Sequence, residues 1–151
     1  QRRDFTVNGL YYDVKSDRVI DHVGGLTDIK MRCLRMIGDP DIRLCEDPVR
    51  MLRAIKFSAK AKLHMEETLK AAILRHSAKL TDCGPSRLLD ERFKLLSIGH
   101  AAHTVKLMEE CNILEQLLPY IKDFLARDRT STQTARSSLL AHLSALDLLI
   151  H

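Results

Sequence analysis

The distribution of apolar residues divides the chain into two unlike parts that meet near Cys45. Before that residue, short β-prone stretches alternate with polar turns, and no single period covers the apolar positions. After it, apolar residues recur at the three- and four-residue spacing of amphipathic helices. The pattern therefore predicts a mainly α chain, in which a helical bundle is preceded by a small α/β segment.

In the first part, the pattern predicts a β-hairpin between two short helices. Residues 11–14 and 18–21 are β-prone and flank the polar turn Lys15-Ser16-Asp17. Asp4 can cap a helix over residues 5–10, and a second helix is predicted over residues 27–31. Residues 34–37 are then expected to run extended into a turn at Gly38-Asp39-Pro40.

The second part has a clear helix start signal at Asp47-Pro48. Aspartate can accept the free amide protons of a first turn, and proline fits the first helical position. Leu52, Ile55 and Ala59 follow at helical spacing and should face a core. Further helices are predicted over residues 66–80, 86–97 (with Leu88 and Leu89 apolar), 101–110, 113–118 and 139–150, and an exposed loop over residues 127–138.

Composition narrows the class of protein. The chain of 151 residues is 45% hydrophobic and lacks Trp, so aliphatic side chains must form its core. No apolar run approaches the roughly 20 residues that span a bilayer, and no leader opens the chain, so we expect a cytoplasmic protein without a membrane partner. A net charge of +4 is compatible with a polyanionic partner, although many soluble enzymes share such a charge.

The four cysteines give no sign of a metal site or a disulfide framework. Cys33, Cys45, Cys83 and Cys111 are widely spread and form no C-x-x-C pair. Free thiols in a reducing compartment are the favoured interpretation.

Two short segments in the first part could bind a ligand. In Arg2-Arg3-Asp4, two guanidiniums could hold phosphate oxygens while Asp4 accepts a hydrogen bond from a ribose hydroxyl. Taken alone, the tripeptide is more simply a surface charge cluster with Asp4 as a helix cap. The segment with Gly24, Gly25 and Asp28 suits a tight turn or a hinge, and it lacks the spacing of a phosphate loop.

A third segment, residues 46–57, combines a carboxylate with a basic helix face. Arg50, Arg53, Lys56 and Lys60 are predicted to lie on roughly one face, opposite the apolar stripe. Asp47 and Arg50 near the start of that helix would present an acceptor and a forked donor, which can imitate the hydrogen-bonding edge of a nucleobase. The simpler alternative is an N-cap followed by a solvated arginine.

Together these segments resemble the motif series of class II CCA-adding enzymes and bacterial poly(A) polymerases. The motifs are R-R-D-F-T-x-N-x-L at residues 2–10, D-x-x-G-G-x-x-D at 21–28, I-G-D-P at 37–40 and E-D-P-V-R-M-L-R-A-I-K-F at 46–57. The resemblance covers residues 2–119, including a neck-like stretch at 87–96. It implies a C-terminal remnant of a nucleotidyltransferase head at residues 1–37, a helical neck that selects nucleotide and binds RNA at 38–118, and the start of a helical body at 119–151.

The resemblance also implies roles for particular residues. Arg2, Arg3 and Asp4 would contact the ribose and triphosphate, and Gly24, Gly25 and Asp28 would belong to a flexible link. Glu46 would orient Asp47 and Arg50, which would read the base edge, while Arg53 would support the base or the phosphates. Lys56 and Lys60, on the predicted basic face, are expected to contact RNA phosphates.

The implied reaction is attack of an RNA 3′-hydroxyl on ATP with release of pyrophosphate, assisted by Mg²⁺. The phosphate turn and D-x-D metal pair of this family are expected upstream of Arg2, and Asp39 and Asp41 stand in the wrong context to replace them. We therefore assign no catalytic or metal-binding residue to this chain and expect the 151-residue piece alone to be inactive.

Among the related activities, Asp21-His22-Val23-Gly24-Gly25 resembles the poly(A) polymerase branch more than the CCA-adding branch. The expected partners are ATP and an RNA 3′ end, of mRNA or tRNA. CCA addition is the alternative within the family, and a non-catalytic helical RNA-binding module is the alternative of another class. A plain scaffold would not explain why Glu46, Asp47 and Arg50 stand together after the other motifs.

Overall fold

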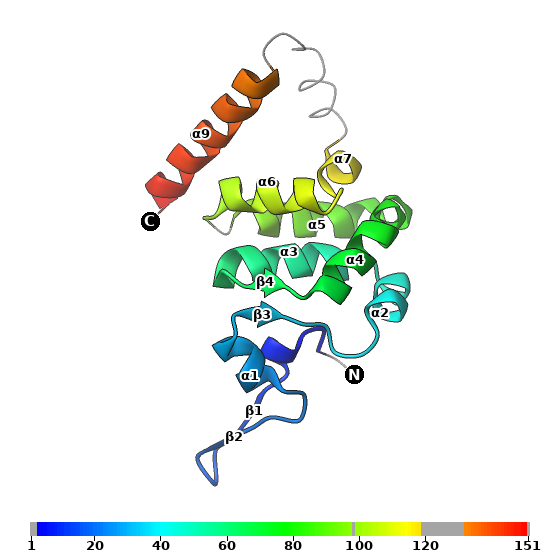
Figure 1. The fold of residues 1–151 in the computed structure, drawn as a ribbon, viewed down its shortest axis with the longest axis vertical. Coiled ribbons are helices and arrows are strands. Elements are labelled where there is room, and N and C mark those ends of the chain that lie inside the picture. The colour runs from blue at the N-terminus through cyan, green and yellow to red at the C-terminus, as the bar shows by residue number, and fades with distance from the viewer. Residues whose placement is uncertain (1–2, 98, 119–131, 151) are drawn as a thin grey trace.

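The computed structural model describes residues 3–97, 99–118 and 132–150, and it is mainly helical as predicted (Figure 1). In chain order its elements are η1 (Thr6–Asn8), β1 (Tyr11–Asp13), β2 (Arg18–Ile20), α1 (Gly25–Lys30), β3 (Cys33–Leu34), α2 (Pro40–Glu46), α3 (Arg50–Ala61), β4 (His64–Met65), α4 (Glu67–His76), η2 (Ser77–Asp82), α5 (Pro85–Leu96), α6 (Ala101–Glu110), α7 (Leu114–Leu117) and α9 (Thr132–Ile150).

These elements stack along the long axis of the molecule. The β1–β2 hairpin lies at one end, α3 and α4 lie in the middle, α5 and α6 form the next layer, and α9 lies at the far end (Figure 1). None of the described helices is both long enough and apolar enough to span a membrane.

The hairpin forms where the sequence predicts it. β1 pairs antiparallel with β2, with Tyr11 opposite Ile20 and Asp13 opposite Arg18. The Asp13 carboxylate accepts hydrogen bonds from the Lys15 N–H and the Ser16 hydroxyl, which fixes the polar turn.

The predicted helix over residues 5–10, capped by Asp4, is wrong. The structure has only the 3₁₀ turn η1, and the Asn8 side chain accepts a hydrogen bond from the Phe5 N–H at 3.2 Å. The chain before η1 is instead extended, since the Thr6 N–H donates to the Arg35 carbonyl and the Ile37 N–H donates to the Asp4 carbonyl. This pairing leaves the Asp4 side chain available for another contact.

Helix α2 was not predicted, although its start signal is present. The Asp39 carboxylate accepts a hydrogen bond from the Ile42 N–H, and Pro40 occupies the first helical position. This is the arrangement that the sequence predicted at Asp47-Pro48 instead. At Asp47-Pro48 the chain makes a tighter turn, because the N–H groups of Arg50 and Met51 donate to carbonyls three residues back. Helix α3 therefore begins at Arg50 rather than Asp47.

The core lies where the helical stripes predicted it. Leu52, Ile55 and Ala59 of α3 are buried, together with Leu69 and Ile73 of α4. Below them the short parallel pair of β3 and β4 joins the first part of the chain to the helices.

Helix α5 turns Leu88 and Leu95 inward and leaves Leu89 49% exposed. Two boundary predictions are corrected by the structure. The helix predicted over 66–80 ends at His76 and continues as η2. Residues 132–138 of the predicted loop belong to α9, while residues 127–131 lie outside the described residues.

Cys33, Cys45, Cys83 and Cys111 are free thiols in the structure. Burial raises the pKa of the Cys111 thiol to about 11, so this thiol is protonated near neutral pH.

Candidate functional site

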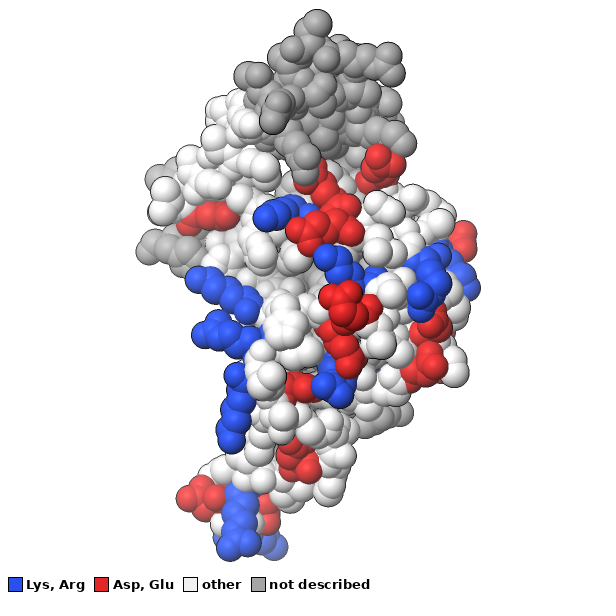
Figure 2. Space-filling model, viewed as in Figure 1, with Lys and Arg blue, Asp and Glu red and all other residues white. Residues whose placement is uncertain are grey.

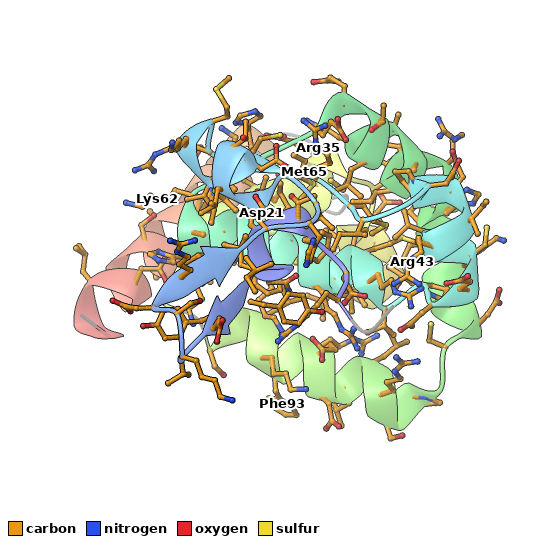
Figure 3. The ribbon with its side chains drawn as sticks, turned by 90° about the horizontal axis from the view of Figure 1, so that it is seen from below. Asp21, Arg35, Arg43, Lys62, Met65 and Phe93 are labelled. Carbon is orange, nitrogen blue, oxygen red and sulfur yellow. The ribbon has the colours of Figure 1, made fainter. Side chains whose placement is uncertain are left out.

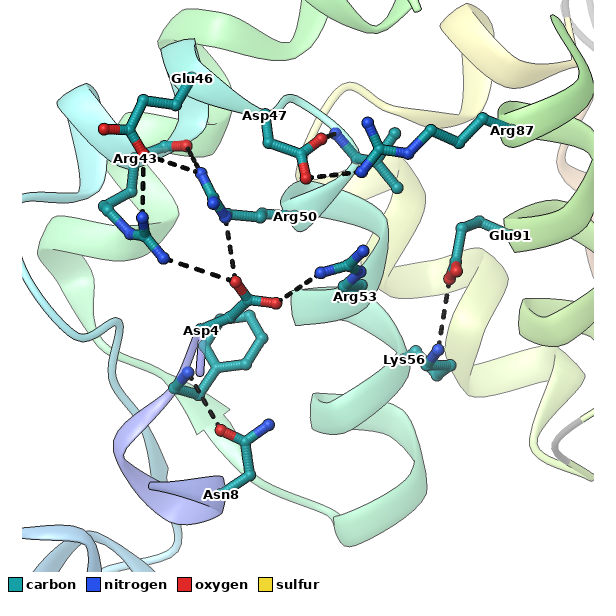
Figure 4. Close-up of polar contacts among 12 residues, drawn as sticks. Asp4, Asn8, Arg43, Glu46, Asp47, Arg50, Arg53, Lys56, Arg87 and Glu91 are labelled. Carbon is teal, nitrogen blue, oxygen red and sulfur yellow. Dashed lines mark hydrogen bonds and ion pairs between the residues drawn. The ribbon is translucent and has the colours of Figure 1, made fainter. Parts of the chain in front are cut away.

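The carboxylate of Asp4 joins the N-terminal segment to the start of α3. Its Oδ1 accepts from Arg50 Nε at 3.0 Å, and its Oδ2 accepts from Arg53 Nη1 at 2.7 Å (Figure 4). A third guanidinium approaches from α2, with Arg43 Nη2 at 3.7 Å from Oδ1. One carboxylate from the first motif is thus surrounded by three arginines.

The environment of Asp4 keeps it ionised. Burial by itself raises the pKa of this carboxyl, because Asp4 is only 8% exposed. Hydrogen bonds and charge attraction from Arg53 and Arg50 outweigh burial, so the pKa of Asp4 lies below its usual value. The same contacts raise the pKa of Arg53 despite the opposing effect of its own burial.

Glu46 holds Arg50 from the other side. Arg50 Nη1 donates to the Arg43 carbonyl at 2.6 Å and to Glu46 Oε2 at 3.2 Å. Glu46 also accepts from Arg43 Nη1 at 2.9 Å. The orientation of Arg50 is therefore fixed by residues of α2 together with Asp4.

Asp47 is held separately, by α5. Its Oδ2 accepts from Arg87 Nη2 at 2.7 Å, and its Oδ1 accepts from the Val49 N–H at 3.3 Å. The Asp47 and Arg50 side chains are 15% and 14% exposed, so both lie at the rim of the packed helices rather than in the apolar core. Both side chains are thus fixed at the N-terminal end of α3 (Figure 4).

The structure corrects the predicted continuous basic face of α3. Arg50 and Arg53 are paired with Asp4, and Lys56 Nζ lies 3.2 Å from Glu91 Oε2. Burial raises the pKa of Glu91, but the nearby lysines outweigh it and the pKa is lowered. Of these four cations, Lys60 is exposed and the other three are partly buried.

Arg2 lies outside the described residues, and Arg3 is exposed. Sequence reasoning did not assign a role to Arg43 or Arg87, although both complete the cluster. Arg87 lies in the neck-like stretch of the resemblance, so the family motif could have pointed to it, whereas nothing in the sequence singled out Arg43.

The cluster around the start of α3 carries a small positive charge. It contains four arginines and three carboxylates, which leave one positive charge in excess, and this excess suits an anionic ligand.

The glycine segment packs closely on η1. Gly24, the N-cap residue before α1, has a φ of +79°, and a Cβ on Gly25 would lie 2.2 Å from the Thr6 carbonyl oxygen. Asp28 is buried, accepts from the Thr6 hydroxyl at 2.6 Å and lies 3.3 Å from Arg35. The hinge role of these residues stays a prediction, and the contacts indicate that α1 and η1 would move as one unit.

Within residues 3–97, 99–118 and 132–150, no group of three or more His, Cys, Asp and Glu side chains is placed to hold a metal ion. The clustered groups can provide hydrogen bonds and charge. They offer fixed acceptors at Asp4 and Asp47 and a fixed donor at Arg50, in a setting with a small positive excess.

Comparisons with known proteins agree with the motifs. Residues 1–35 match the family described as "Poly A polymerase head domain", and residues 62–125 match "Probable RNA and SrmB-binding site of polymerase A". The chain is 42% identical over 131 residues to "Poly(A) polymerase I" of Escherichia coli O6:H1, which covers 87% of this chain and 28% of that protein. It is 35% identical over 123 residues to a "CCA-adding enzyme" of a Geobacillus species, covering 82% of this chain and 30% of that protein.

A solved structure described as the complex of a CCA-adding enzyme with ATP has the same fold. It superposes with a TM-score of 0.71 at 28% identity, covering 78% of this chain and 29% of that one. The chain thus spans less than a third of the length of these relatives.

Proposed function

Because this chain is homologous to bacterial poly(A) polymerase I and to CCA-adding enzymes, we propose that it is part of a template-independent RNA nucleotidyltransferase that adds AMP from ATP to RNA 3′ ends. The observation that carries the proposal is the Asp4–Arg50 contact, across which the first motif and the neck motif meet 46 residues apart in sequence. Residues 1–37 would belong to the head, residues 38–118 to the neck and residues 119–151 to the body.

In this proposal Asp47 and Arg50 read the incoming base. The pairing edge of adenine offers an amino donor and a ring-nitrogen acceptor, which complement a carboxylate and a guanidinium. An ionised carboxylate has about four lone-pair positions, so Asp47 can bind a base while it keeps its bonds to Arg87 and Val49. Glu46 then positions Arg50 through the 3.2 Å contact.

The remaining site residues would bind the rest of the nucleotide. Arg2, Arg3 and Asp4 would contact the ribose and triphosphate, and Arg53 would support the base or the phosphates. Asp4 already accepts from Arg50 and Arg53, and its other lone pairs remain for a ribose hydroxyl. Gly24, Gly25 and Asp28 would link the head to the neck, and Lys56 and Lys60 would contact RNA.

The reaction proposed for the full-length protein is attack of an RNA 3′-hydroxyl on ATP with release of pyrophosphate. Mg²⁺ would supply charge stabilisation during this transfer. The described side chains offer no group that fits a metal ion, so the proposal assigns no metal ligand to them. We also place the protein in the cytoplasm, acting on mRNA or tRNA ends.

The test is nucleotide choice in the full-length protein. Asp47→Asn and Arg50→Gln should reduce the preference for ATP over GTP and UTP, whose bases present the reversed order of donor and acceptor, by about tenfold or more, which corresponds to roughly 1.4 kcal/mol. RNA affinity should change little. Asp90→Asn, at an exposed position on α5, is the matched control. Full ATP preference and rate in both variants would contradict the base-reading role.

CCA addition is the second candidate, favoured by the 35% identity to a CCA-adding enzyme. Cytosine presents the same order of amino donor and ring-nitrogen acceptor as adenine, so the Asp47 and Arg50 pair would accept CTP as well. Each triphosphate should be supplied alone to a generic RNA primer and to a trimmed tRNA. Incorporation of CMP on the tRNA would support CCA addition, and no incorporation of any nucleotide would support a binding module.

A further inference from the structure

The positive charge of α3 is neutralised in its first half and free at its C-terminal end. Arg50 and Arg53 are paired with Asp4, and Lys56 is paired with Glu91. Lys60 and Lys62, at the other end of the helix, are exposed and form no ion pair with any described residue. Exposed cations without partners have the most to gain from an anionic ligand.

Two more cations join them from the first part of the chain. The Arg32 carbonyl accepts from the His64 N–H at 2.9 Å, where β3 pairs with β4, so Arg32 lies close to Lys62. Lys30 ends α1 two residues earlier. Lys30 and Arg32 are both exposed and, like Lys60 and Lys62, unpaired among the residues that the structure describes. We call Lys30, Arg32, Lys60 and Lys62 the basic edge.

The figures show how these segments share one side of the molecule. In Figure 2 a row of Lys and Arg side chains follows the left edge, from the level of α3 to the level of α1. Figure 3 places Lys62 at the edge of the molecule on the same side as α1. Lys30 and Arg32 belong to one segment of the chain and Lys60 and Lys62 to another, and the pairing of β3 with β4 brings the two segments together.

Backbone geometry supports a role for two of these side chains. Arg32 and Lys62 have φ values of +51° and +52°, a left-handed conformation that costs a residue with a Cβ roughly 1 kcal/mol. Glycine or asparagine would fit both positions with less strain. Long cations nevertheless occupy them at the point where each chain segment enters its strand.

We propose that the basic edge binds the phosphates of the RNA primer strand upstream of its 3′ end. The strand would leave the nucleotide site along the partly exposed face of α3 that carries Arg53 and Lys56, and it would reach the basic edge at the C-terminal end of that helix. This assignment rests on the proposed function, because it takes the Asp47 and Arg50 end of α3 as the site of the 3′ end.

Helix geometry gives the proposal a length. Ten residues separate Arg50 from Lys60, which is about 15 Å at roughly 1.5 Å per residue. At about 3.4 Å per stacked nucleotide, this distance corresponds to roughly four nucleotides. Primers longer than this should contact the basic edge, and di- and trinucleotides should not.

A neighbouring cavity of about 610 Å³ is lined by Lys62 and His64 of the basic edge region and by Lys106 of α6. Glu67 and Glu110 line it too, and Glu110 is paired with Lys70. Because of these carboxylates we assign phosphate binding to the basic edge and not to the cavity.

The test is the salt dependence of RNA binding by the full-length protein. The variant combines Arg32→Asn, Lys60→Gln and Lys62→Asn, because asparagine tolerates the left-handed backbone at residues 32 and 62. For a 15-nucleotide oligo(A), the slope of log affinity against log salt should become shallower by about 0.7 for each lost phosphate contact, or about 2 in total. Affinity at low salt should fall at least about tenfold, while affinity for a dinucleotide should not change.

Lys79→Ala, which removes an exposed lysine from η2 beyond the other end of α4, is the matched control and should leave the slope unchanged. A second control, Arg32→Lys combined with Lys62→Arg, keeps both charges and should bind RNA as tightly as the wild-type protein. An unchanged slope in the triple variant, or an equal loss of affinity for long and short primers, would overturn the proposal. The proposal would also be overturned if the triple variant still bound RNA but no longer bound anionic lipid vesicles, because the basic edge would then bind a membrane surface.

Nucleotide choice separates this proposal from the one on which it rests. The triple variant should keep its preference for ATP, since none of its changes touches Asp47 or Arg50. If the basic-edge variant loses RNA affinity while Asp47→Asn and Arg50→Gln keep ATP preference, the basic edge stands as an RNA-binding surface and the base-reading role fails.

Discussion

The Arg87 side chain is the residue through which α5 acts on the proposed nucleotide site. Its Nη2 lies 2.7 Å from Asp47 Oδ2, and its side chain is 53% exposed. An ion pair this exposed contributes little to stability, about 0–1 kcal/mol. Its effect should therefore be on the orientation of the Asp47 carboxylate rather than on folding.

We predict that Arg87→Gln weakens ATP preference without unfolding the protein. The expected change is about tenfold in the ratio of kcat/KM for ATP to that for GTP, whose pairing edge has the reversed order of donor and acceptor, with a thermal unfolding midpoint close to that of the wild type. Arg87→Lys should recover part of the preference, because lysine keeps one donor but loses the fork. Single-nucleotide incorporation assays measure both. An unchanged ratio in Arg87→Gln would exclude a positioning role.

Sequence reasoning found some members of this cluster and missed others for a physical reason. Asp4, Glu46, Asp47 and Arg50 stand in motifs, so their residue types in order were enough to select them. Arg43 and Arg87 contribute only through the positions of α2 and α5, which bring them to Asp4 and Asp47 across the fold. No spacing along the chain indicates such contacts.

At the scale of elements, the two Asp-Pro pairs show why a start signal is not enough. Helix α2 begins at Asp39-Pro40, where the Asp39 carboxylate accepts a hydrogen bond from the Ile42 N–H. Asp47-Pro48 instead follows α2 directly, and the Asp47 carboxylate binds the Val49 N–H and Arg87. The tertiary contact with α5 takes the side chain away from a normal cap position, so α3 starts three residues later than predicted.

Helix α6 shows the opposite case, a cap supplied from far along the chain. Asp147 of α9 accepts from the N–H groups of Ala101 and Ala102, at 2.7 and 3.2 Å. A carboxylate at a helix N-terminus satisfies free amide donors and interacts favourably with the helix dipole. The sequence around residue 100 could not predict this cap, because 46 residues separate Ala101 from its partner.

We predict that Asp147→Ala lowers the free energy of unfolding by about 1 kcal/mol, within the usual range for the loss of a cap. Hydrogen exchange of the Ala101 and Ala102 amides should become faster, because their acceptor is lost. Asp147→Asn should retain part of the effect. Ser144→Ala, at an exposed position of the same helix, is the control and should leave these amides protected. Unchanged exchange in Asp147→Ala would show that α9 does not hold α6.

At the scale of the whole molecule, Asp4 provides a buried ionic connection between the first part of the chain and the helices. Its carboxylate is buried and accepts from Arg50 and Arg53. Removing one partner from a buried ion pair leaves the others uncompensated, which costs about 3–5 kcal/mol. The contribution of Asp4 should also depend on pH.

We predict that Asp4→Asn lowers the free energy of unfolding by about 3 kcal/mol at neutral pH. The folded pKa of Asp4 lies below its unfolded value of about 3.9, so its stabilising contribution is complete above that value and is lost as pH falls through the folded pKa. The difference in stability between the two proteins should therefore shrink progressively as the pH falls below about 3.9. Urea unfolding at several pH values measures this, with Asp90→Asn as control. A constant difference across the range would contradict the prediction.

The overall division of the molecule was predictable, while the placement of charge was not. Periodicity located the helical core and the hairpin, because both depend on local spacing. A net charge of +4 gave no indication that Asp4 and Glu91 neutralise one half of α3 while the other half stays free. That asymmetry depends on which helices pack together, and it sets the direction proposed for the RNA strand.

The long sequence distance across the Asp4 contact has a consequence during protein synthesis. Arg50 is made 46 residues after Asp4, and at about 5–20 residues per second the ribosome needs roughly 2–9 seconds to reach it. During that delay the Asp4 carboxylate lacks Arg50 and Arg53, the two guanidiniums that donate hydrogen bonds to it. Its attachment to the helices must therefore be a late event that follows emergence of α3 from the ribosome.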